Sequence, residues 1–147
     1  MLVFNRFRLV PFAVPAFAIA ALAGCNDEPT NVEEHEVAFV EVRLGTQAVR
    51  HDEGTTVTGG PLVIQRGANN ITITFLDEDG EPITDIATEE DHTVVVQPGN
   101  ALLTFAASSK LAGVLTGVNA GQSSLSIELK HGDHSDFGPK SIPVVVQ

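Results

Sequence analysis

Two stretches of this chain, Asn70-Ile71-Thr72-Ile73-Thr74-Phe75-Leu76 and Ser123-Ser124-Leu125-Ser126-Ile127-Glu128-Leu129-Lys130, contain apolar residues that alternate with polar ones. This period of two is typical of a β-strand with one face in a core and the other in water. Rougher signals of the same kind predict further strands at 37–44, 61–65, 92–97, 101–105, 113–118 and 141–146. Turns rich in glycine separate them, and no apolar helical stripe appears after residue 35. This pattern predicts an all-β, two-sheet β-sandwich over residues 36–147.

Two segments of the predicted sandwich resemble a known family. Residues 62–67 (LVIQRG) run into 71–75 (ITITF), and 113–121 (GVLTGVNAG) run into 125–127 (LSI). Both resemble bacterial immunoglobulin-like domains of group 2, in which the second segment is a glycine turn that feeds the penultimate strand. The family's usual aromatic residue on the third strand is missing, and residues 46–60 are an addition. The resemblance implies an immunoglobulin-like sandwich with altered strand assignments.

The first 24 residues have the layout of an export signal. Arg6 and Arg8 lie in a segment without acidic residues, and residues 9–22 (LVPFAVPAFAIAAL) are almost wholly apolar. That stretch is too short to span a bilayer as a helix. Residues 22–25, Leu-Ala-Gly-Cys, resemble the lipobox of bacterial lipoproteins, in which the cysteine becomes the lipidated first residue of the mature chain. The resemblance implies a signal peptide over residues 1–24 and lipid attachment at Cys25.

The segment after the lipobox favours a tethered protein. Cys25 is the only cysteine, so it has no partner for an internal disulfide; the alternative is a free thiol after an ordinary signal peptide. Residues 25–35 comprise the lipidated cysteine and an acidic linker, for which we expect a flexible tether. We therefore expect a location in the cell envelope, on the periplasmic side. Asn26, in place of the aspartate that marks inner-membrane retention in enterobacteria, favours the outer membrane.

Charge and missing motifs exclude several functions. The formal net charge is −11, and it becomes −13 if Arg6 and Arg8 leave with the signal peptide. Nucleic acid is not an expected partner, because its phosphates need a basic face. The chain lacks a nucleophile elbow, a phosphate-binding glycine loop and a dinucleotide fingerprint, so we expect no enzyme and no catalytic residues. The expected partners are the membrane, through the lipid, and an envelope protein or glycan.

Histidines supply the one candidate site. The segment His131-Gly132-Asp133-His134-Ser135-Asp136 places two imidazoles and two carboxylates in the expected loop between the last two strands. In an immunoglobulin-type sandwich this loop shares a pole with the segment that ends at His92. The candidate ligands for Zn²⁺ or Cu²⁺ are therefore His92, His131 and His134, with Asp133 or Asp136.

Other interpretations of the histidines and acids stay open. The histidines can equally be solvated side chains without a ligand. His35 falls within reach of the same pole, whereas His51 is expected at the other end of the sandwich. The acidic loop 77–91 is solvated by default, with weak calcium binding as its alternative.

Two functions follow from these features. The first is a non-enzymatic, envelope-anchored lipoprotein that presents an immunoglobulin-like binding or structural module. The alternative is a periplasmic lipoprotein that binds a divalent metal, Zn²⁺ or Cu²⁺, through a His-x-x-His loop.

Overall fold

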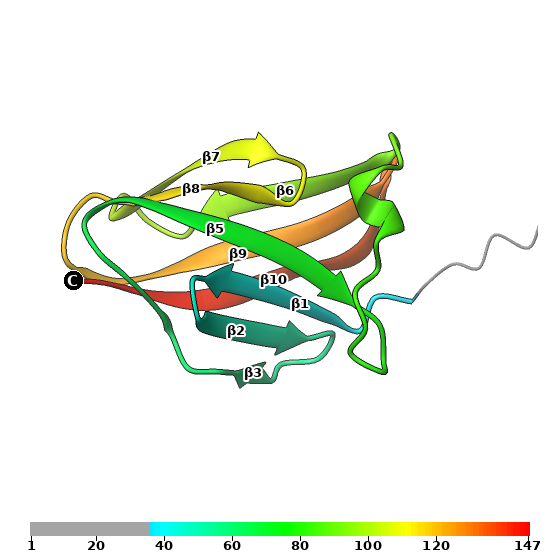
Figure 1. The fold of residues 1–147 in the computed structure, drawn as a ribbon, viewed down its shortest axis with the longest axis horizontal. Coiled ribbons are helices and arrows are strands. Elements are labelled where there is room, and N and C mark those ends of the chain that lie inside the picture. Colours follow the sequence, from blue (N-terminus) through cyan, green and yellow to red (C-terminus); the bar gives the residue numbers. More distant parts are fainter. Residues whose placement is uncertain (1–35) are drawn as a thin grey trace, which may run out of the picture. The chain divides into compact units, whose positions relative to one another are not determined.

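The computed structural model describes residues 36–147, which form a β-sandwich of two sheets (Figure 1). One sheet has six strands in the order β3-β2-β1-β5-β8-β7, and the other has four in the order β4-β10-β9-β6. The strands are β1 Phe39–Leu44, β2 Gln47–Asp52, β3 Val57–Thr58, β4 Leu62–Ile64, β5 Gly67–Leu76, β6 His92–Pro98, β7 Leu103–Ser109, β8 Ala112–Gly117, β9 Gly121–His131 and β10 His134–Val146. Within the described residues the one helical segment is a short 3₁₀ turn, η1 (Asp85–Ala87). The prediction of an all-β sandwich is confirmed.

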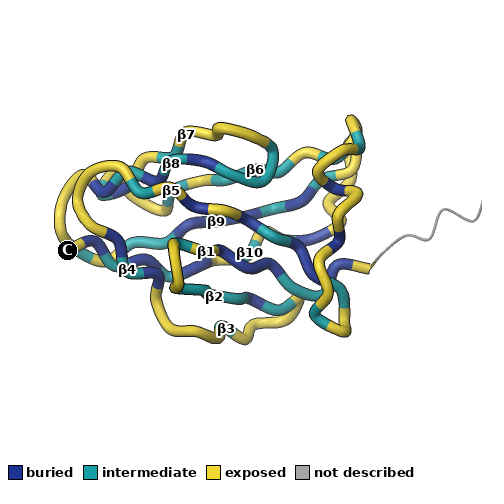
Figure 2. The backbone as a smooth tube through the Cα atoms, in the orientation of Figure 1, coloured by how far each residue is buried: buried dark blue, intermediate teal, exposed yellow. Residues whose placement is uncertain are grey.

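The core lies between the sheets and follows the alternation seen in the sequence. On β5, Ile73 and Phe75 are buried while Thr72 is exposed (Figure 2). On β9 the buried residues Leu125, Ile127 and Leu129 occupy the inward positions. The Phe75 ring meets the Phe137 ring of β10 edge to face, with centroids 6.0 Å apart. Fully burying each such side chain stabilises the fold by about 1.5–3 kcal/mol relative to exposure.

Residues 46–60 contribute strands β2 and β3. Gly45 has a φ of +57°, which lets the chain reverse into a hairpin that pairs Val42 with Val49 and Val40 with His51. The expectation that His51 lies at the other end of the sandwich is therefore wrong. Because β2 runs back along β1, His51 returns to the end where β1 begins and where β5 meets loop 77–91.

The last two strands are longer than the sequence indicated. His131 ends β9 and His134 begins β10, so only Gly132 and Asp133 form the turn between them. The expectation that both histidines occupy a loop is corrected: both are strand residues. The sequence pattern predicted that the last strand begins at residue 141, after the Gly138-Pro139 dipeptide. The strand instead runs through this dipeptide, with a register shift between Phe137 and Lys140.

Candidate metal centre

Two histidines from neighbouring strands lie at one end of the sandwich. Sheet register pairs His92 of β6 with His131 of β9. Residues two apart on a strand share a face, so His92 faces inward like Val94, and His131 faces inward like Leu129. The His92 side chain is 13% exposed and that of His131 is 48% exposed. The pair therefore occupies the open end of the interior, partly accessible to solvent.

The two imidazoles stack and turn a nitrogen each toward the same carboxylate. Their ring centroids are 4.7 Å apart and the ring planes differ by 18°. His92 Nε2 lies 3.6 Å from Asp136 Oδ2, and His131 Nδ1 lies 3.9 Å from that same oxygen. One ligand atom from each of the three residues falls within 4.8 Å of the others. In a tetrahedral zinc site with bonds of 2.0–2.1 Å, ligand atoms are separated by about 3.3–3.4 Å, so a small contraction brings these donors to bonding distance.

A β-bulge accounts for the position of Asp136. The register of β10 against β9 shifts between Ser135 and Phe137, which leaves Asp136 as the extra residue. An extra residue interrupts the in-and-out alternation and redirects a side chain. Asp136 consequently turns toward the imidazoles, although the buried Phe137 next to it faces the core.

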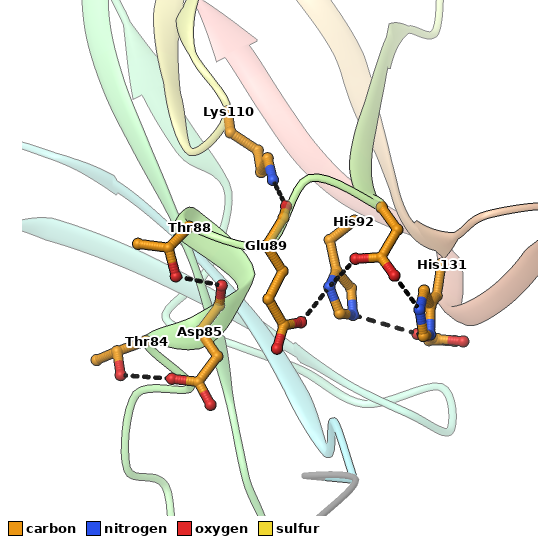
Figure 3. Close-up of polar contacts among 9 residues, drawn as sticks. Thr84, Asp85, Thr88, Glu89, His92, Lys110 and His131 are labelled. Atoms are coloured by element: carbon orange, nitrogen blue, oxygen red, sulfur yellow. Dashed lines mark hydrogen bonds and ion pairs between the residues drawn. The ribbon is translucent and has the colours of Figure 1, made fainter. Parts of the chain in front are cut away.

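The other nitrogen of each ring faces a carboxylate from loop 77–91 (Figure 3). His131 Nε2 lies 2.8 Å from Asp91 Oδ2, in a hydrogen bond. His92 Nδ1 lies 2.6 Å from Glu89 Oε2 and 3.9 Å from Asp91 Oδ1. The Glu89 contact is close but poorly aligned, because His92 Nδ1 is buried without a hydrogen bond of good geometry. Each imidazole thus has one nitrogen toward Asp136 and one toward a loop carboxylate.

These carboxylates change the pKa of His131, and His131 in turn changes the pKa of Asp91. The hydrogen bond to Asp91 raises the pKa of His131 above its usual 6.5, and the nearby charges of Asp136 and Glu89 raise it further. The same hydrogen bond lowers the pKa of Asp91 below its usual 3.8. In the metal-free protein the pole therefore favours an imidazolium–carboxylate pair.

Backbone contacts hold loop 77–91 against the histidines. The Lys110 ammonium, from the β7–β8 turn, donates to the Glu89 carbonyl (Figure 3). The Gly132 N–H donates to the Asp91 carbonyl at 2.9 Å, which ties the loop to the β9–β10 turn. The Thr88 hydroxyl donates to the Asp85 carbonyl at 3.1 Å within η1. The carboxylates of Glu89 and Asp91 are thus positioned by tied segments of the loop.

The structure brings together part of the predicted ligand set. His92, His131 and Asp136 form one cluster of possible metal ligands among residues 36–147, and Glu89, Asp91 and His92 form a second. His134 is the register partner of His131 but belongs to neither cluster, and Asp133 lies in the turn, also outside both. His51 is buried, and its Nδ1 lies 2.8 Å from the Asp52 carbonyl oxygen.

The sequence pattern did not predict that two carboxylates of the second cluster lie beside histidines. Glu89 and Asp91 were assigned only to the acidic loop, although they stand three residues and one residue before His92. That short spacing was the available signal. His35 and Cys25 lie outside the described residues.

No known protein family matches this chain, and no curated protein matches it in sequence. Among residues 36–147, no helix has the length and apolar character needed to cross a membrane. The chemistry of the described pole and the lipobox-like sequence of residues 22–25 are therefore the basis for a proposed function.

Proposed function

We propose that this protein is an envelope-anchored lipoprotein whose sandwich binds a divalent transition metal, Zn²⁺ or Cu²⁺, through His92, His131 and Asp136. One observation carries the proposal: three donor atoms from three strands lie within 4.8 Å of one another, while the remaining nitrogen of each imidazole lies near a carboxylate. Histidine ligands of metals usually donate their second N–H to such a carboxylate, which fixes the ring and increases its basicity. Asp91 serves His131 in this way, and Glu89 lies 2.6 Å from His92 Nδ1 as its nearest carboxylate, without the alignment of a hydrogen bond.

The donor set favours transition metals over calcium and magnesium. Two imidazole nitrogens and one carboxylate oxygen suit Zn²⁺ or Cu²⁺, whereas Ca²⁺ and Mg²⁺ take six or more oxygen ligands. Three protein ligands leave one position of a four-coordinate ion for water or for a donor from another molecule. This open position favours a site whose metal ion exchanges with solution, consistent with the exposure of His131 at the rim.

The described part of the chain begins, at residue 36, at the same end of the sandwich as the site. The Ala38 N–H donates to the carbonyl of Leu76, the residue before loop 77–91, at 2.9 Å. Residues 26–35 reach at most about 33–36 Å when extended. With lipid on Cys25, metal captured at His92 and His131 is held close to the membrane surface.

Calorimetric titration of the purified full chain in detergent with Zn²⁺ and Cu²⁺ tests the metal site. We expect one equivalent to bind, and we expect His131→Ala to raise the dissociation constant at least about 100-fold, because loss of an outer partner alone costs about 10- to 100-fold. The matched variant His134→Ala removes the register partner of His131 and should leave the affinity nearly unchanged. Absence of binding, or an equal loss in both variants, contradicts the proposal.

A separate experiment tests the anchor. Cys25→Ser should move the protein from the membrane fraction to the soluble fraction of the envelope, because one cysteine carries all of the proposed lipid. The metal stoichiometry of this variant should match that of the original protein, since Cys25 is not a proposed ligand. Unchanged membrane partitioning contradicts lipid anchoring but leaves the metal site to its own test.

A further inference from the structure

Charged residues are distributed very unevenly along this chain. From His92 to Ile127, Lys110 is the one residue among Asp, Glu, Lys and Arg, and this segment includes all of β6, β7 and β8. Loop 77–91, in contrast, contains eight acidic residues and no basic ones. One lateral margin of the sandwich is therefore nearly uncharged, and one pole is strongly acidic.

The two lateral margins of the sandwich also differ in how their strand edges are protected. On one side the edge strands are short: β3 has two residues and β4 has three. The Gln47 side chain crosses from β2 to β4, where its amide donates to the Val63 carbonyl and accepts from the Val63 N–H, both at 3.0 Å. This side therefore offers little free backbone to another strand.

Within residues 36–147, the edge strands of the opposite margin, β6 and β7, are unpaired on their outer sides. β6 and β7 have seven residues each, and among the described strands each pairs with one neighbour only, β6 with β9 and β7 with β8. Five of the seven residues of β7 are exposed, and the strand lies at the margin of the tube in Figure 2. Between the two edges, Val94, Val96 and Phe105 pack on the core while remaining partly exposed. β7 also contains neither charge nor proline, which commonly block pairing, and its one irregularity against β8 lies near its end, between Ala107 and Ser109.

We propose that β7 of one copy pairs antiparallel with β7 of a second copy around a twofold axis, which joins the two six-stranded sheets. The same patch on both copies makes such a contact self-complementary. Charge favours this place and this direction for the contact. Two copies of this strongly negative chain repel each other least where they meet through an uncharged surface, and β7 has no charged residue.

The direction of β7 completes the argument for an antiparallel pair. β7 runs from Leu103, which pairs with Gly117, toward Lys110, which contacts Glu89 of the acidic loop. An antiparallel partner therefore places the two acidic poles at opposite ends of the dimer. A parallel partner would place them side by side.

Sedimentation analysis of the full chain in density-matched detergent tests this contact. We expect a dimer that dissociates on dilution, in zinc and in chelator alike, because no metal ligand lies on β7. Thr104→Lys places an ammonium group on the exposed edge and should raise the dissociation constant of the dimer at least about tenfold. Thr72→Lys is the matched control: Thr72 is also exposed, but it lies on β5, with paired strands on both sides.

A monomer at every concentration overturns the proposal and favours a strand from a different protein as the occupant of the edge. An equal effect of Thr72→Lys and Thr104→Lys also overturns it. If Thr104→Lys fails to fold, Ala106→Cys provides the test, because residue 106 is exposed near the middle of β7, where the twofold axis of the dimer is expected. Oxidation of this variant should yield peptides that contain two copies of residue 106 joined by a disulfide, located by mass spectrometry, and their absence refutes the β7 contact.

Discussion

Replacing Asp136 with asparagine removes the anionic donor between the two imidazoles and keeps the size of the side chain. Metal that binds only the folded protein stabilises it by mass action, by about 2.7 kcal/mol at a concentration of 100 times Kd. A folded unit of about 110 residues has an unfolding entropy of about 0.23 kcal/mol/K. Zinc at that concentration should therefore raise the Tm of the original protein by about 12 °C.

The expected loss follows from the same arithmetic. If Asp136→Asn weakens binding about 100-fold, the same zinc concentration equals the new Kd and stabilises by about 0.4 kcal/mol. The rise in Tm then falls to about 2 °C. Asp133→Asn is the matched control, because Asp133 lies in the adjacent turn, outside both clusters.

Differential scanning calorimetry of the full chain, with and without zinc, measures these shifts. The difference between the two variants is the decisive quantity, since both lose one negative charge from the same hairpin. A zinc-dependent rise that survives Asp136→Asn, or that falls equally in Asp133→Asn, refutes the assignment of Asp136 as a ligand.

Three further predictions concern the metal-free protein. Asp91→Asn should bring the pKa of His131 down toward 6.5 in an NMR titration. The contribution of the ion pair to stability appears as pH rises through the carboxyl pKa, is greatest up to about pH 6.5, and is lost as pH rises through the raised imidazole pKa. A constant difference in the free energy of unfolding between the original protein and the variant across that range contradicts the pairing. Gln47→Glu keeps the shape of the side chain but loses the donor to the Val63 carbonyl, and urea unfolding should show a loss of about 1–3 kcal/mol, whereas an unchanged midpoint argues against the contact. Gly113→Ala should destabilise by about 1–3 kcal/mol in the same assay, because its Cβ would lie 2.7 Å from a backbone oxygen of β7, and full stability would show that this strand moves freely.

Sequence periodicity was sufficient to predict the fold class because most strands have one buried face. On β9 every second residue from Leu125 to Leu129 is buried, and this alternation is visible without coordinates. β2 escaped prediction because its sequence, QAVRHD, has few apolar residues, and its two buried residues are Val49 and His51. A buried histidine does not register as an apolar position, so the alternation was lost.

The candidate site was only partly predictable for a different reason. Strand register, which the sequence does not specify alone, decides that His92 faces His131. The bulge that turns Asp136 toward them depends on a mismatch in pairing between β9 and β10. Spacing in the sequence suggested His134 as strongly as His131, and only the three-dimensional arrangement separates them.

At the proposed metal site, protons and a metal ion would compete for the imidazole of His131. Loop 77–91 contributes eight acidic residues, and Lys110 donates to the backbone carbonyl of Glu89 in this loop rather than to a carboxylate. Protonated His131 balances part of this charge at low pH. As pH rises through its raised pKa, that positive charge is lost while Asp91, whose pKa is lowered, stays ionised. A divalent ion bound to neutral His131 would restore positive charge in the same pH range in which the ligand nitrogen of His131 becomes free. Metal affinity should therefore increase as pH rises through the pKa of His131, and a dissociation constant that is flat across that range would show that His131 does not bind the ion.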